Sequence, residues 1–402
     1  MFSEQYHSIQ EQIDKLSGSP WIPGGDSIAN SAEDFIPALW ADGFGSGGDL
    51  DRNLIERAER VRRAAYGNRL FAVVPLYVSS YCAEQCLYCN YRAGNSGMGV
   101  ARKRLTADEL QREATFLIEE KGFRTIELVY ASDPQMSATR IAGDVEFVRN
   151  LLERHGGGLV GLSCEAMDLP DYQRLAEAGV SFSVLWMETY DAERYRALHP
   201  GRLRKANFGY RLDAYERMIT AGIPAVGIGV LSGLSDWRRD WAMLMLHQDY
   251  LRRTCGRGAS ILGIPRLKHA PGAAMHGSEF IPTTNEFLAT LALHSLFSPS
   301  TVPFVSTRED WGTCVTIAAG GGCLFTLNCS TIPGGYSLET SGAQFANNSF
   351  DAPTFAPRLR ELGFDLRFQW SPADLEATSP IPIDSTEQAV SLPISPRAAA
   401  SK

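Results

Sequence analysis

The sequence has no long hydrophobic run and no excess of basic residues, and these two absences exclude whole classes of protein. No apolar stretch in the 402 residues approaches the roughly 20 residues that a membrane-spanning helix needs. Lys and Arg number 38 against 46 Asp and Glu, which gives a formal net charge of -8 where a nucleic-acid-binding surface would be basic. Hydrophobic residues make up 44% and charged residues 21% of the chain. We therefore expect a soluble globular protein of the cytoplasm that binds neither membrane nor nucleic acid.

The cysteines lack the arrangement of a disulfide framework or of a typical zinc site. We find no secretory signal, and a chain of this length does not need disulfides to stabilise a core. Structural zinc is usually held by two pairs of closely spaced ligands, but no second Cys-x-x-Cys pair and no His-x-x-x-His pair occurs. Five cysteines are scattered through apolar surroundings, as expected of small buried residues: Cys164, Cys255, Cys314, Cys323 and Cys329.

The other three cysteines, Cys82, Cys86 and Cys89, lie together between Tyr81 and Asn90. Thiolates are the preferred ligands of iron–sulfur clusters, and these short spacings allow three of them to hold one [4Fe–4S] unit. The fourth iron is then open to another ligand, such as the adjacent amine and carboxylate of S-adenosylmethionine. Zinc remains the alternative for this loop.

Residues 70–330 alternate short β-branched runs with longer amphipathic stretches, which predicts repeated βα units. Helices are expected between the runs, for example over Thr106 to Lys121, where Thr106 begins a capping box. The fold class is therefore α/β, a closed (β/α)8 TIM-type barrel whose reactive groups sit at the C-terminal strand ends. The eight expected strands are Leu70 to Val78, Thr125 to Tyr130, Gly158 to Ser163, Val180 to Met187, Ala225 to Leu231, Ala259 to Ile264, Val302 to Ser306 and Gly322 to Leu327.

The segments outside the barrel divide into three parts. Residues 1–69 are expected to form a helical extension interrupted at Gly24, Gly25 and Gly43 to Gly48. Residues 331–370 are expected to close the barrel, with one helix over Asn347 to Leu366. Residues 371–402, rich in Pro, Ser, Thr and Ala, are expected to be a disordered tail.

The spacing Cys-x3-Cys-x2-Cys, with Tyr88 before the last cysteine, resembles the radical S-adenosylmethionine (radical SAM) signature. From about Phe71 to Trp370 the chain resembles the 2-iminoacetate synthase group more narrowly. This group contains the tyrosine lyases of thiamine synthesis and of hydrogenase maturation, with a tryptophan lyase of thiopeptide biosynthesis as a more distant relative. The matching segments fall at or just past the expected strand ends: Val74 to Cys82, Met187 to Tyr190, Gly227 to Asp236, Ile264 to Lys268, Val305 to Glu309 and Pro333 to Tyr336.

The resemblance implies a role for several individual residues. Arg308 would hold the substrate carboxylate, because a guanidinium matches two carboxylate oxygens, and Thr326 would add a hydrogen bond. Tyr77 would face the amino acid. The cluster ligands would be Cys82, Cys86 and Cys89, and the contacts to S-adenosylmethionine would come from Tyr88, Glu188, Arg211, Ser132 and Gly229.

Residue chemistry alone offers a plainer explanation for most of these positions. Arg308 and Glu309 could form a surface ion pair of little energetic value. Tyr77 could be a core residue, Glu188 could cap the helix that follows it, and Gly229 could mark a tight strand end.

The reaction that the resemblance implies is fragmentation of an aromatic L-amino acid by a 5'-deoxyadenosyl radical. Tyrosine is the first choice, with Cα–Cβ cleavage to 2-iminoacetate and p-cresol, and tryptophan is the second. Rearrangement or radical coupling in a specialised natural-product pathway is the enzymatic alternative, and a passive iron–sulfur or zinc binding module is the non-enzymatic one. The implied electron donor is reduced flavodoxin or ferredoxin, and a partner synthase is allowed.

Two departures from the group's pattern weaken the choice of substrate. Relatives carry a Gly-Glu pair after the second strand that contacts the S-adenosylmethionine amine, whereas Ala131 and Ser132 stand here, with Ser132 or Asp133 as candidate substitutes. Trp186 stands where relatives have a smaller or polar residue. In addition, no cysteine follows Cys329, so the second cluster of the hydrogenase-maturation members is not expected.

Overall fold

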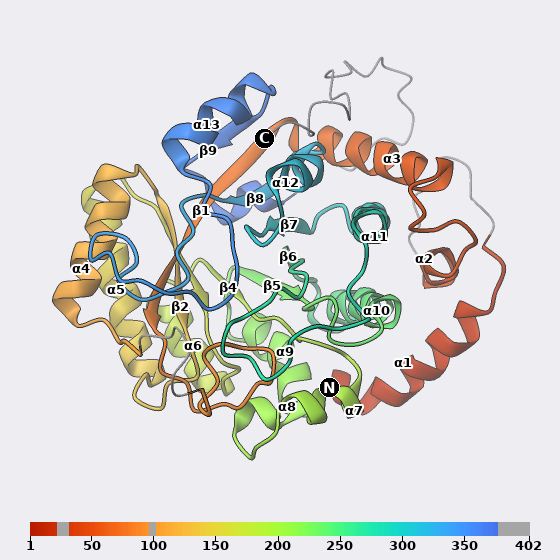
Figure 1. Cartoon of the computed structure of the whole chain (residues 1–402), viewed down its shortest axis with the longest axis horizontal. Helices are drawn as coiled ribbons and strands as arrows, with labels where there is room; N and C mark the ends of the chain where they lie inside the picture. Colours follow the sequence, from red (N-terminus) through yellow and green to blue (C-terminus); the bar gives the residue numbers. More distant parts are fainter. Residues whose placement is uncertain (22–31, 96–101, 377–402) are drawn as a thin grey trace.

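Eight parallel strands close into a barrel with helices around its outside, as Figure 1 shows in a computed structural model that describes residues 1–21, 32–95 and 102–376. The strand order runs from β2 through β8 to β1, and β1 also pairs with β2, which completes the ring. The predicted fold class is confirmed, and each expected strand overlaps an observed one. The strands are β1 Arg69–Ser79, β2 Thr125–Tyr130, β3 Leu159–Ser163, β4 Phe182–Val184, β5 Ala225–Gly229, β6 Ile261–Gly263, β7 Val302–Val305 and β8 Cys323–Thr326.

The inward-facing side chains change character along the barrel axis. At the N-terminal ends of the strands they form an apolar plug that includes Phe71, Val73, Phe182 and Leu324. The outward-facing residues pack against the helices in a separate, larger core. Towards the C-terminal ends the inward side chains are more polar and leave a cavity. This division places stability at one end of the barrel and binding at the other.

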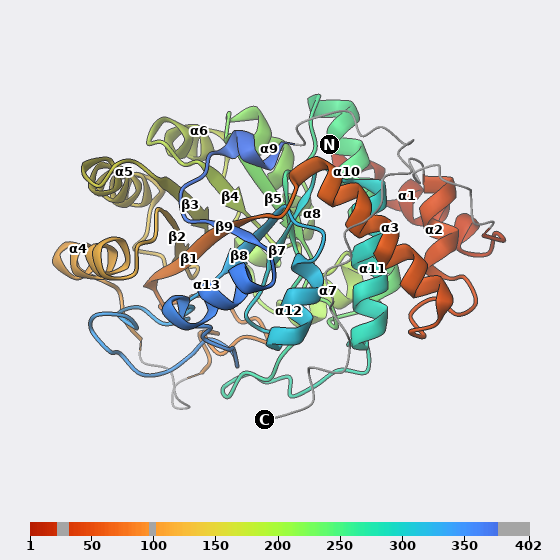
Figure 2. The ribbon, with the colours of Figure 1, turned by 90° about the horizontal axis from the view of Figure 1, so that it is seen from above.

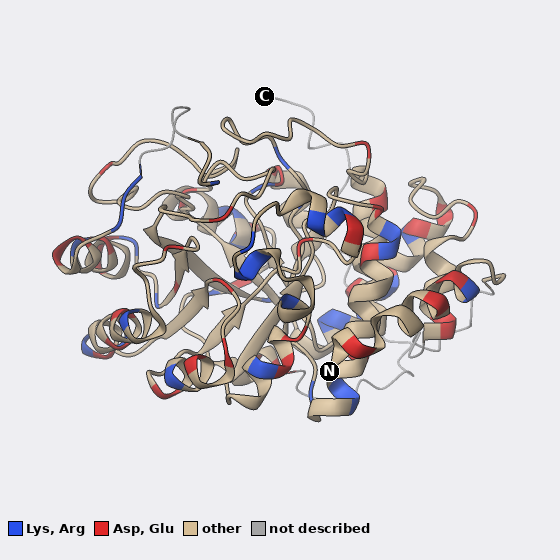
Figure 3. Ribbon diagram, turned by 90° about the horizontal axis from the view of Figure 1, so that it is seen from below, with Lys and Arg blue, Asp and Glu red and all other residues tan. Residues whose placement is uncertain are grey.

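The helices that surround the barrel begin where local capping favours them. The predicted capping box at Thr106 is confirmed, since its hydroxyl accepts a hydrogen bond from the Glu109 N–H. Charged residues of both signs lie along these outer helices, while the strands carry few (Figure 3). The helices are α4 Ala107–Thr115, which continues as the π-helical turn Phe116–Glu120, α5 Ala138–Arg154, α6 Leu169–Glu177, α7 Ala192–Leu198, α8 Phe208–Leu212, α9 Ala214–Thr220, α10 Trp237–Cys255, α11 Thr284–Phe297 and α12 Trp311–Ala318.

Three N-terminal helices, α1 Phe2–Ser17, α2 Ala32–Leu39 and α3 Asp49–Tyr66, cover one side of the barrel. They pack against α10 and α11, as Figure 2 shows from above. Of the expected breakers, the Gly43 to Gly48 stretch forms the turn between α2 and α3, and Gly24 and Gly25 lie outside the described residues. No helix within the described ranges is both long and apolar enough to cross a membrane.

The C-terminal segment differs from its prediction. Instead of one helix over Asn347 to Leu366, the structure has a shorter helix, α13 Ala352–Glu361, capped by Asp351 and followed by Gly363 with a left-handed φ of 84°. Residues Asp365–Arg367 then form a ninth strand, β9, parallel to the start of β1. The reason is that β2 pairs with β1 only from Val74 onward, which leaves the first residues of β1 open to another strand.

The predicted disordered tail is partly ordered. Residues 372–375 form a short 3-10 helix, and Leu375 is buried against the plug at the base of the barrel. Just before it, Trp370 stacks on Phe182 and donates a hydrogen bond from Nε1 to the Ala72 carbonyl at 3.1 Å. The rest of the predicted tail, residues 377–402, lies outside the described residues.

Candidate active site

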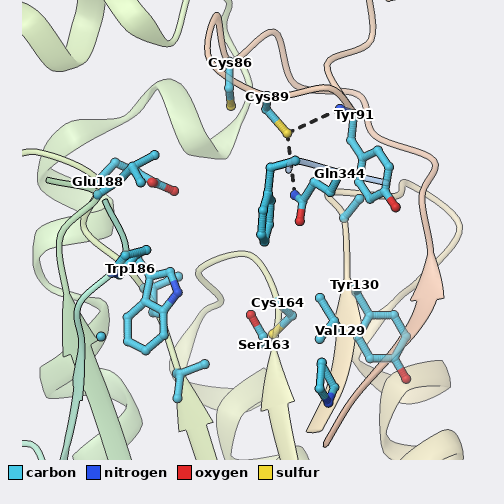
Figure 4. A pocket seen from close by; sticks show the side chains of 18 of the residues that line it. Cys86, Cys89, Tyr91, Val129, Tyr130, Ser163, Cys164, Trp186, Glu188 and Gln344 are labelled. Carbon is cyan, nitrogen blue, oxygen red and sulfur yellow. Dashed lines mark hydrogen bonds between the residues drawn. The ribbon is translucent and has the colours of Figure 1, made fainter. Parts of the chain in front are cut away.

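A cavity of about 250 Å³ opens among the C-terminal ends of the strands (Figure 4). Cys86 and Cys89 point into it from the loop after β1, with Glu188 and Trp186 on one wall and Gln344 beside Cys89. All but one of the residues predicted for the site line this cavity: Tyr77, Cys82, Cys86, Tyr88, Cys89, Ser132, Glu188, Arg211, Arg308 and Thr326. Gly229 does not.

The loop that carries the three cysteines is held by backbone hydrogen bonds at both sides. The Ala83 N–H donates to the Ser132 carbonyl at 2.9 Å, and the Leu87 N–H donates to the Leu198 carbonyl at 3.0 Å. Cys89 Sγ accepts hydrogen bonds from the Tyr91 N–H at 3.4 Å and from Gln344 Nε2 at 3.6 Å. The loop is therefore positioned by residues from distant parts of the chain.

The chemistry of these thiols fits a bound iron–sulfur cluster. Burial raises the pKa of both Cys82 and Cys86, so their thiolate forms require a compensating positive charge such as iron. No three His, Cys, Asp or Glu side chains in the described part of the chain converge closely enough to hold a single metal ion. The thiolates of a cubane bind three different irons and so need a wider arrangement than the ligands of one ion.

A buried network of charges forms the wall next to the cysteine loop. Glu188 Oε1 lies 2.7 Å from Lys205 Nζ and 3.4 Å from Arg211 Nη2, and Arg211 Nη1 lies 2.6 Å from Glu165 Oε1. Burial alone would raise the pKa of Glu188, but the charges of Lys205 and Arg211 outweigh burial and hold it at about 2. Burial would also raise the pKa of Glu165, but the charges of Arg211 and Lys205 lower it, so both carboxylates of this wall stay ionised at neutral pH.

The structure also shows what the two candidate substitutes for the missing glutamate, Ser132 and Asp133, do. Ser132 Oγ donates a hydrogen bond to Glu165 Oε2 at 3.0 Å, so the hydroxyl positions a carboxylate that comes from the end of β3. Asp133 is occupied elsewhere, since Arg104 binds both of its oxygens at 2.6 and 2.7 Å. Of the two candidate substitutes, only Ser132 reaches the cavity.

Glu188 is not the cap of the helix that follows it. The side chain of Asp191 caps α7 by accepting hydrogen bonds from the Glu193 and Arg194 N–H groups. Glu188 has a left-handed φ of 75°, which is uncommon for a residue with a Cβ and is held here by the ion pairs with Lys205 and Arg211.

On the other side of the cavity, Arg308 is a half-buried cation without a carboxylate partner among the described residues. Its guanidinium lies 3.5 Å above the centre of the Phe345 ring. The expected alternative, a surface pair with Glu309, is wrong, because Glu309 is buried and accepts from Arg266 Nε at 3.0 Å. Burial lowers the pKa of the Arg308 guanidinium, and a bound anion would compensate it.

The remaining predicted residues have contrasting environments. The Thr326 hydroxyl is buried and has no hydrogen-bond partner within the described ranges. Tyr77 Oη donates to Gln344 Oε1 at 2.9 Å, and Tyr88 Oη lies 2.8 Å from His199 Nε2. Gly229 serves the sheet instead, since a Cβ there would lie 2.4 Å from the Gly263 carbonyl oxygen of the neighbouring strand.

Several lining residues were not predicted: Glu127, Glu165, Lys205, Gln344 and Phe345. Glu165 could have been found, because it lies two residues after the third expected strand, at the end where reactive groups gather. Gln344 and Phe345 carried no such signal, since they come from the long segment between β8 and α13 and reach the cavity only through the tertiary fold.

Comparisons with known proteins agree with this site. Residues 76–246 match the family model "Radical SAM superfamily". The 2-iminoacetate synthase of Escherichia coli (strain K12) is 29% identical over 290 residues, which cover 71% of this chain and 73% of that protein. The 3-methylornithine synthase of Methanosarcina acetivorans is 32% identical over 162 residues, which cover 40% of this chain and 44% of that protein.

Solved structures share the fold over nearly the whole chain. The FeFe-hydrogenase maturase HydG from Carboxydothermus hydrogenoformans has a TM-score of 0.76 at 26% identity and covers 92% of this chain and 82% of its own. Methylornithine synthase (PylB) shares the fold, with a TM-score of 0.66 at 22% identity over 91% of this chain and 98% of its own. These findings favour the cluster over a zinc site and an enzyme over a passive binding module. Residues 76–246 thus form a radical SAM domain in a chain that is related to 2-iminoacetate synthase, and the cofactors are a [4Fe–4S] cluster and S-adenosylmethionine.

Proposed function

We propose that this enzyme cleaves the Cα–Cβ bond of an aromatic L-amino acid, with tyrosine as substrate and 2-iminoacetate and p-cresol as products. The observation that carries the proposal is Arg308, a half-buried cation in the cavity wall that makes no ion pair among the described residues. An amino-acid carboxylate is the ligand that such a guanidinium fits best. The similarity to 2-iminoacetate synthase supports the same choice.

The side chains of this cavity divide between cofactor and substrate. Cys82, Cys86 and Cys89 would hold the cluster. Tyr88, Ser132, Glu188 and Arg211 would contact S-adenosylmethionine, whose ammonium and carboxylate groups suit a wall that carries both signs of charge. When bound, the two cofactors together supply the one-electron chemistry that generates a 5'-deoxyadenosyl radical.

The protein's own contribution is to fix and shield the amino acid. Arg308 would bind the substrate carboxylate, and the unpartnered Thr326 hydroxyl would donate a further hydrogen bond to it. Holding this end limits the rotation of the substrate, so that one of its hydrogens faces the reactive group. The buried walls exclude water, which protects a radical from side reactions.

The proposal is tested by incubating anaerobically reconstituted enzyme with S-adenosylmethionine, a reductant and each aromatic amino acid. We expect p-cresol and glyoxylate, the hydrolysis product of 2-iminoacetate, from tyrosine. Methylindole from tryptophan would support the tryptophan alternative. Formation of 5'-deoxyadenosine without either fragment would contradict a lyase.

The cluster ligands are tested separately. Cys86→Ala should lower the iron content and abolish reductive cleavage of S-adenosylmethionine, because the cluster loses one of three ligands. Cys255→Ala is the matched control, since Cys255 ends α10 and lies outside the cavity lining. Equal iron content in both variants would contradict the assignment.

A second candidate function is rearrangement or coupling of an amino-acid radical in a specialised pathway. Three observations favour it. Trp186 lies on the cavity wall, Ser132 replaces the glutamate of relatives, and the chain is 32% identical over 162 residues to a 3-methylornithine synthase. The products would be isomers or adducts of the amino acid, which mass spectrometry distinguishes from cresol and glyoxylate. A reduced flavodoxin or ferredoxin is the proposed electron donor in either case.

A further inference from the structure

Glu127 is an acidic side chain inside the barrel to which the assignments above give no role. It is the third residue of β2, is only 6% exposed and lines the cavity. Its carboxyl group makes no hydrogen bond or ion pair within the described part of the chain. Glu165 and Glu188, by contrast, each lie beside a cation.

This isolation keeps the Glu127 carboxyl in its neutral form. Burial, without any opposing charge, raises its pKa to about 8. A neutral carboxyl can donate one hydrogen bond and accept others. Leaving such a group unpartnered in an apolar environment is unfavourable, so its presence at the wall of a binding cavity calls for a ligand.

The strand register places Glu127 deep in the cavity. Pro75 pairs with Glu127 and Tyr77 pairs with Val129, so Glu127 lies one inward-facing layer below Tyr77. Arg308, in contrast, follows the end of β7 by three residues and lies nearer the mouth. An amino acid whose carboxylate binds Arg308 would therefore extend its side chain towards Glu127.

The walls between these two ends suit an aromatic ring. Pro75, Val184 and Phe304 line the cavity and present apolar surface, and Trp186 adds an indole face. A ring would be buried among them, while its polar edge would meet Glu127. A phenol hydroxyl donates and accepts, as a neutral carboxyl does, and an indole N–H donates only.

We infer that Glu127 selects aromatic amino acids that carry a hydrogen-bonding group on the ring. A phenol should bind more tightly than an indole, and both should bind more tightly than a plain phenyl ring. The inference rests on the proposed function and adds the group that recognises the side chain. Phenylalanine would bury Glu127 without a partner, and a site built around such a hydrogen bond discriminates strongly against the analogue that lacks it.

Binding is measured by calorimetric titration of reconstituted enzyme loaded with S-adenosylmethionine, without reductant so that no turnover occurs. The titrants are L-tyrosine, L-tryptophan, L-phenylalanine, 4-fluoro-L-phenylalanine and L-lysine. We expect tyrosine to bind at least about tenfold more tightly than phenylalanine. The fluoro analogue, which has the ring but no hydroxyl, should bind like phenylalanine.

Two substitutions test the residue itself. Glu127→Leu should remove the preference, because it weakens the binding of tyrosine and leaves the binding of phenylalanine unchanged. Glu127→Gln should keep most of the preference, because an amide also donates and accepts hydrogen bonds. Thr125→Val is the matched control: Thr125 lies one layer deeper on the same strand, has an unpartnered hydroxyl within the described ranges and does not line the cavity. It should leave the preference unchanged. Iron content and circular dichroism report whether each variant is folded and loaded.

The possible results separate the two proposals. A tyrosine preference that survives in Glu127→Leu, or equal binding of tyrosine and phenylalanine by the wild type, overturns the role of Glu127 alone. Tighter binding of lysine than of tyrosine also overturns it, in favour of an ammonium partner. Absence of binding by every aromatic amino acid overturns the proposed function, and this inference with it. The fluoro analogue decides the question on the wild type even if Glu127→Leu fails to fold.

Discussion

Arg308 and Glu309 are neighbours in the sequence but have opposite environments in the barrel. Glu309 is neutralised by Arg266 and lies 3.7 Å from Lys268 Nζ, whereas Arg308 faces the cavity against the Phe345 ring. The two neighbouring charges therefore have separate roles: Glu309 stabilises the barrel wall, and Arg308 is available to bind a ligand.

Replacing Arg308 tests its proposed role in binding. Arg308→Gln should weaken amino-acid affinity by roughly 10- to 100-fold, because a charge-assisted hydrogen bond contributes about 1.5–3 kcal/mol. The measurement is calorimetric titration of unreduced, S-adenosylmethionine-loaded enzyme. Arg253→Gln, on the exposed side of α10, serves as control and should bind normally. Unchanged affinity in Arg308→Gln would exclude a contact with the carboxylate.

Glu127 should make folding stability depend on pH. Its folded-state pKa of about 8 lies above the ordinary value of 4.5, so the folded protein keeps a proton that the unfolded chain releases in this range. Its contribution to stability is full below pH 4.5 and is lost as the pH rises through 8.

Glu127→Gln cannot titrate, so the variant should gain stability relative to the wild type as the pH rises from about 6 to 8, by an amount on the order of a few kcal/mol. Thermal unfolding of the two reconstituted proteins across this pH range measures the difference. A difference that stays constant with pH would show that Glu127 is ionised throughout.

Gln344 joins a proposed cluster ligand to a proposed substrate residue. Its Nε2 donates to Cys89 Sγ at 3.6 Å, and its Oε1 accepts from Tyr77 Oη at 2.9 Å. Hydrogen bonds to ligand sulfurs stabilise the more negative, reduced cluster and thus raise its reduction potential.

Gln344→Leu should therefore lower the reduction potential of the cluster. A lost hydrogen bond of about 0.5–1.5 kcal/mol corresponds to a shift of roughly 20–60 mV for one electron. Spectroelectrochemical titration measures the shift. Tyr77→Phe removes the other partner of Gln344 and should change the potential much less. Equal shifts in both variants would argue against a direct effect of the Cys89 contact.

At the scale of the elements, small residues decide how closely the strands approach. A Cβ at Gly229 in β5 would meet the backbone of Gly263 in β6, and a Cβ at Gly263 would meet the Trp186 ring at 2.2 Å. These glycines let Trp186 lie against the barrel wall while the two strands stay paired.

Gly229→Ala should therefore destabilise the protein, by about 1–3 kcal/mol as for other overpacked cores. Gly143→Ala is the matched control, because Gly143 lies within α5 with nothing within 4 Å of the added methyl group. That variant should gain up to about 1 kcal/mol from helix propensity. The midpoint of thermal unfolding compares them, and equal midpoints would contradict the close approach of β5 and β6.

At the scale of the whole molecule, one end of the barrel stabilises the fold and the other forms the binding cavity. The C-terminal segment returns to the base, where β9 pairs with β1 and Trp370 packs on Phe71 and Phe182. The cavity opens at the opposite end, beside the cysteine loop.

Trp370→Ala should lower stability by about 3–5 kcal/mol, the usual effect of truncating a buried aromatic residue. Amino-acid affinity at temperatures where the variant is folded should stay close to that of the wild type, because the cavity lies at the other end. Trp40→Ala, at a partly buried position after α2, should cause a smaller loss. A large loss of affinity without a loss of stability in Trp370→Ala would contradict this division.

The sequence alone determined the features that depend on local spacing. Eight β-branched runs predicted the barrel, and three cysteines within eight residues predicted the cluster. Both signals depend only on residues that are close together in the sequence. It could not show that Asp365–Arg367 forms a strand, since that pairing depends on the part of β1 that β2 leaves open.

Only the tertiary structure decided which polar groups have partners. Gln344 donates a hydrogen bond to Cys89, from which it is separated by 255 positions of sequence. Nothing in the sequence of β2 indicated that Glu127 would face a cavity without a partner among the described residues. Closing the barrel brings such residues together or isolates them, because its interior collects side chains from every strand. The type of chemistry follows from local sequence, and the choice of substrate follows from that enclosed space.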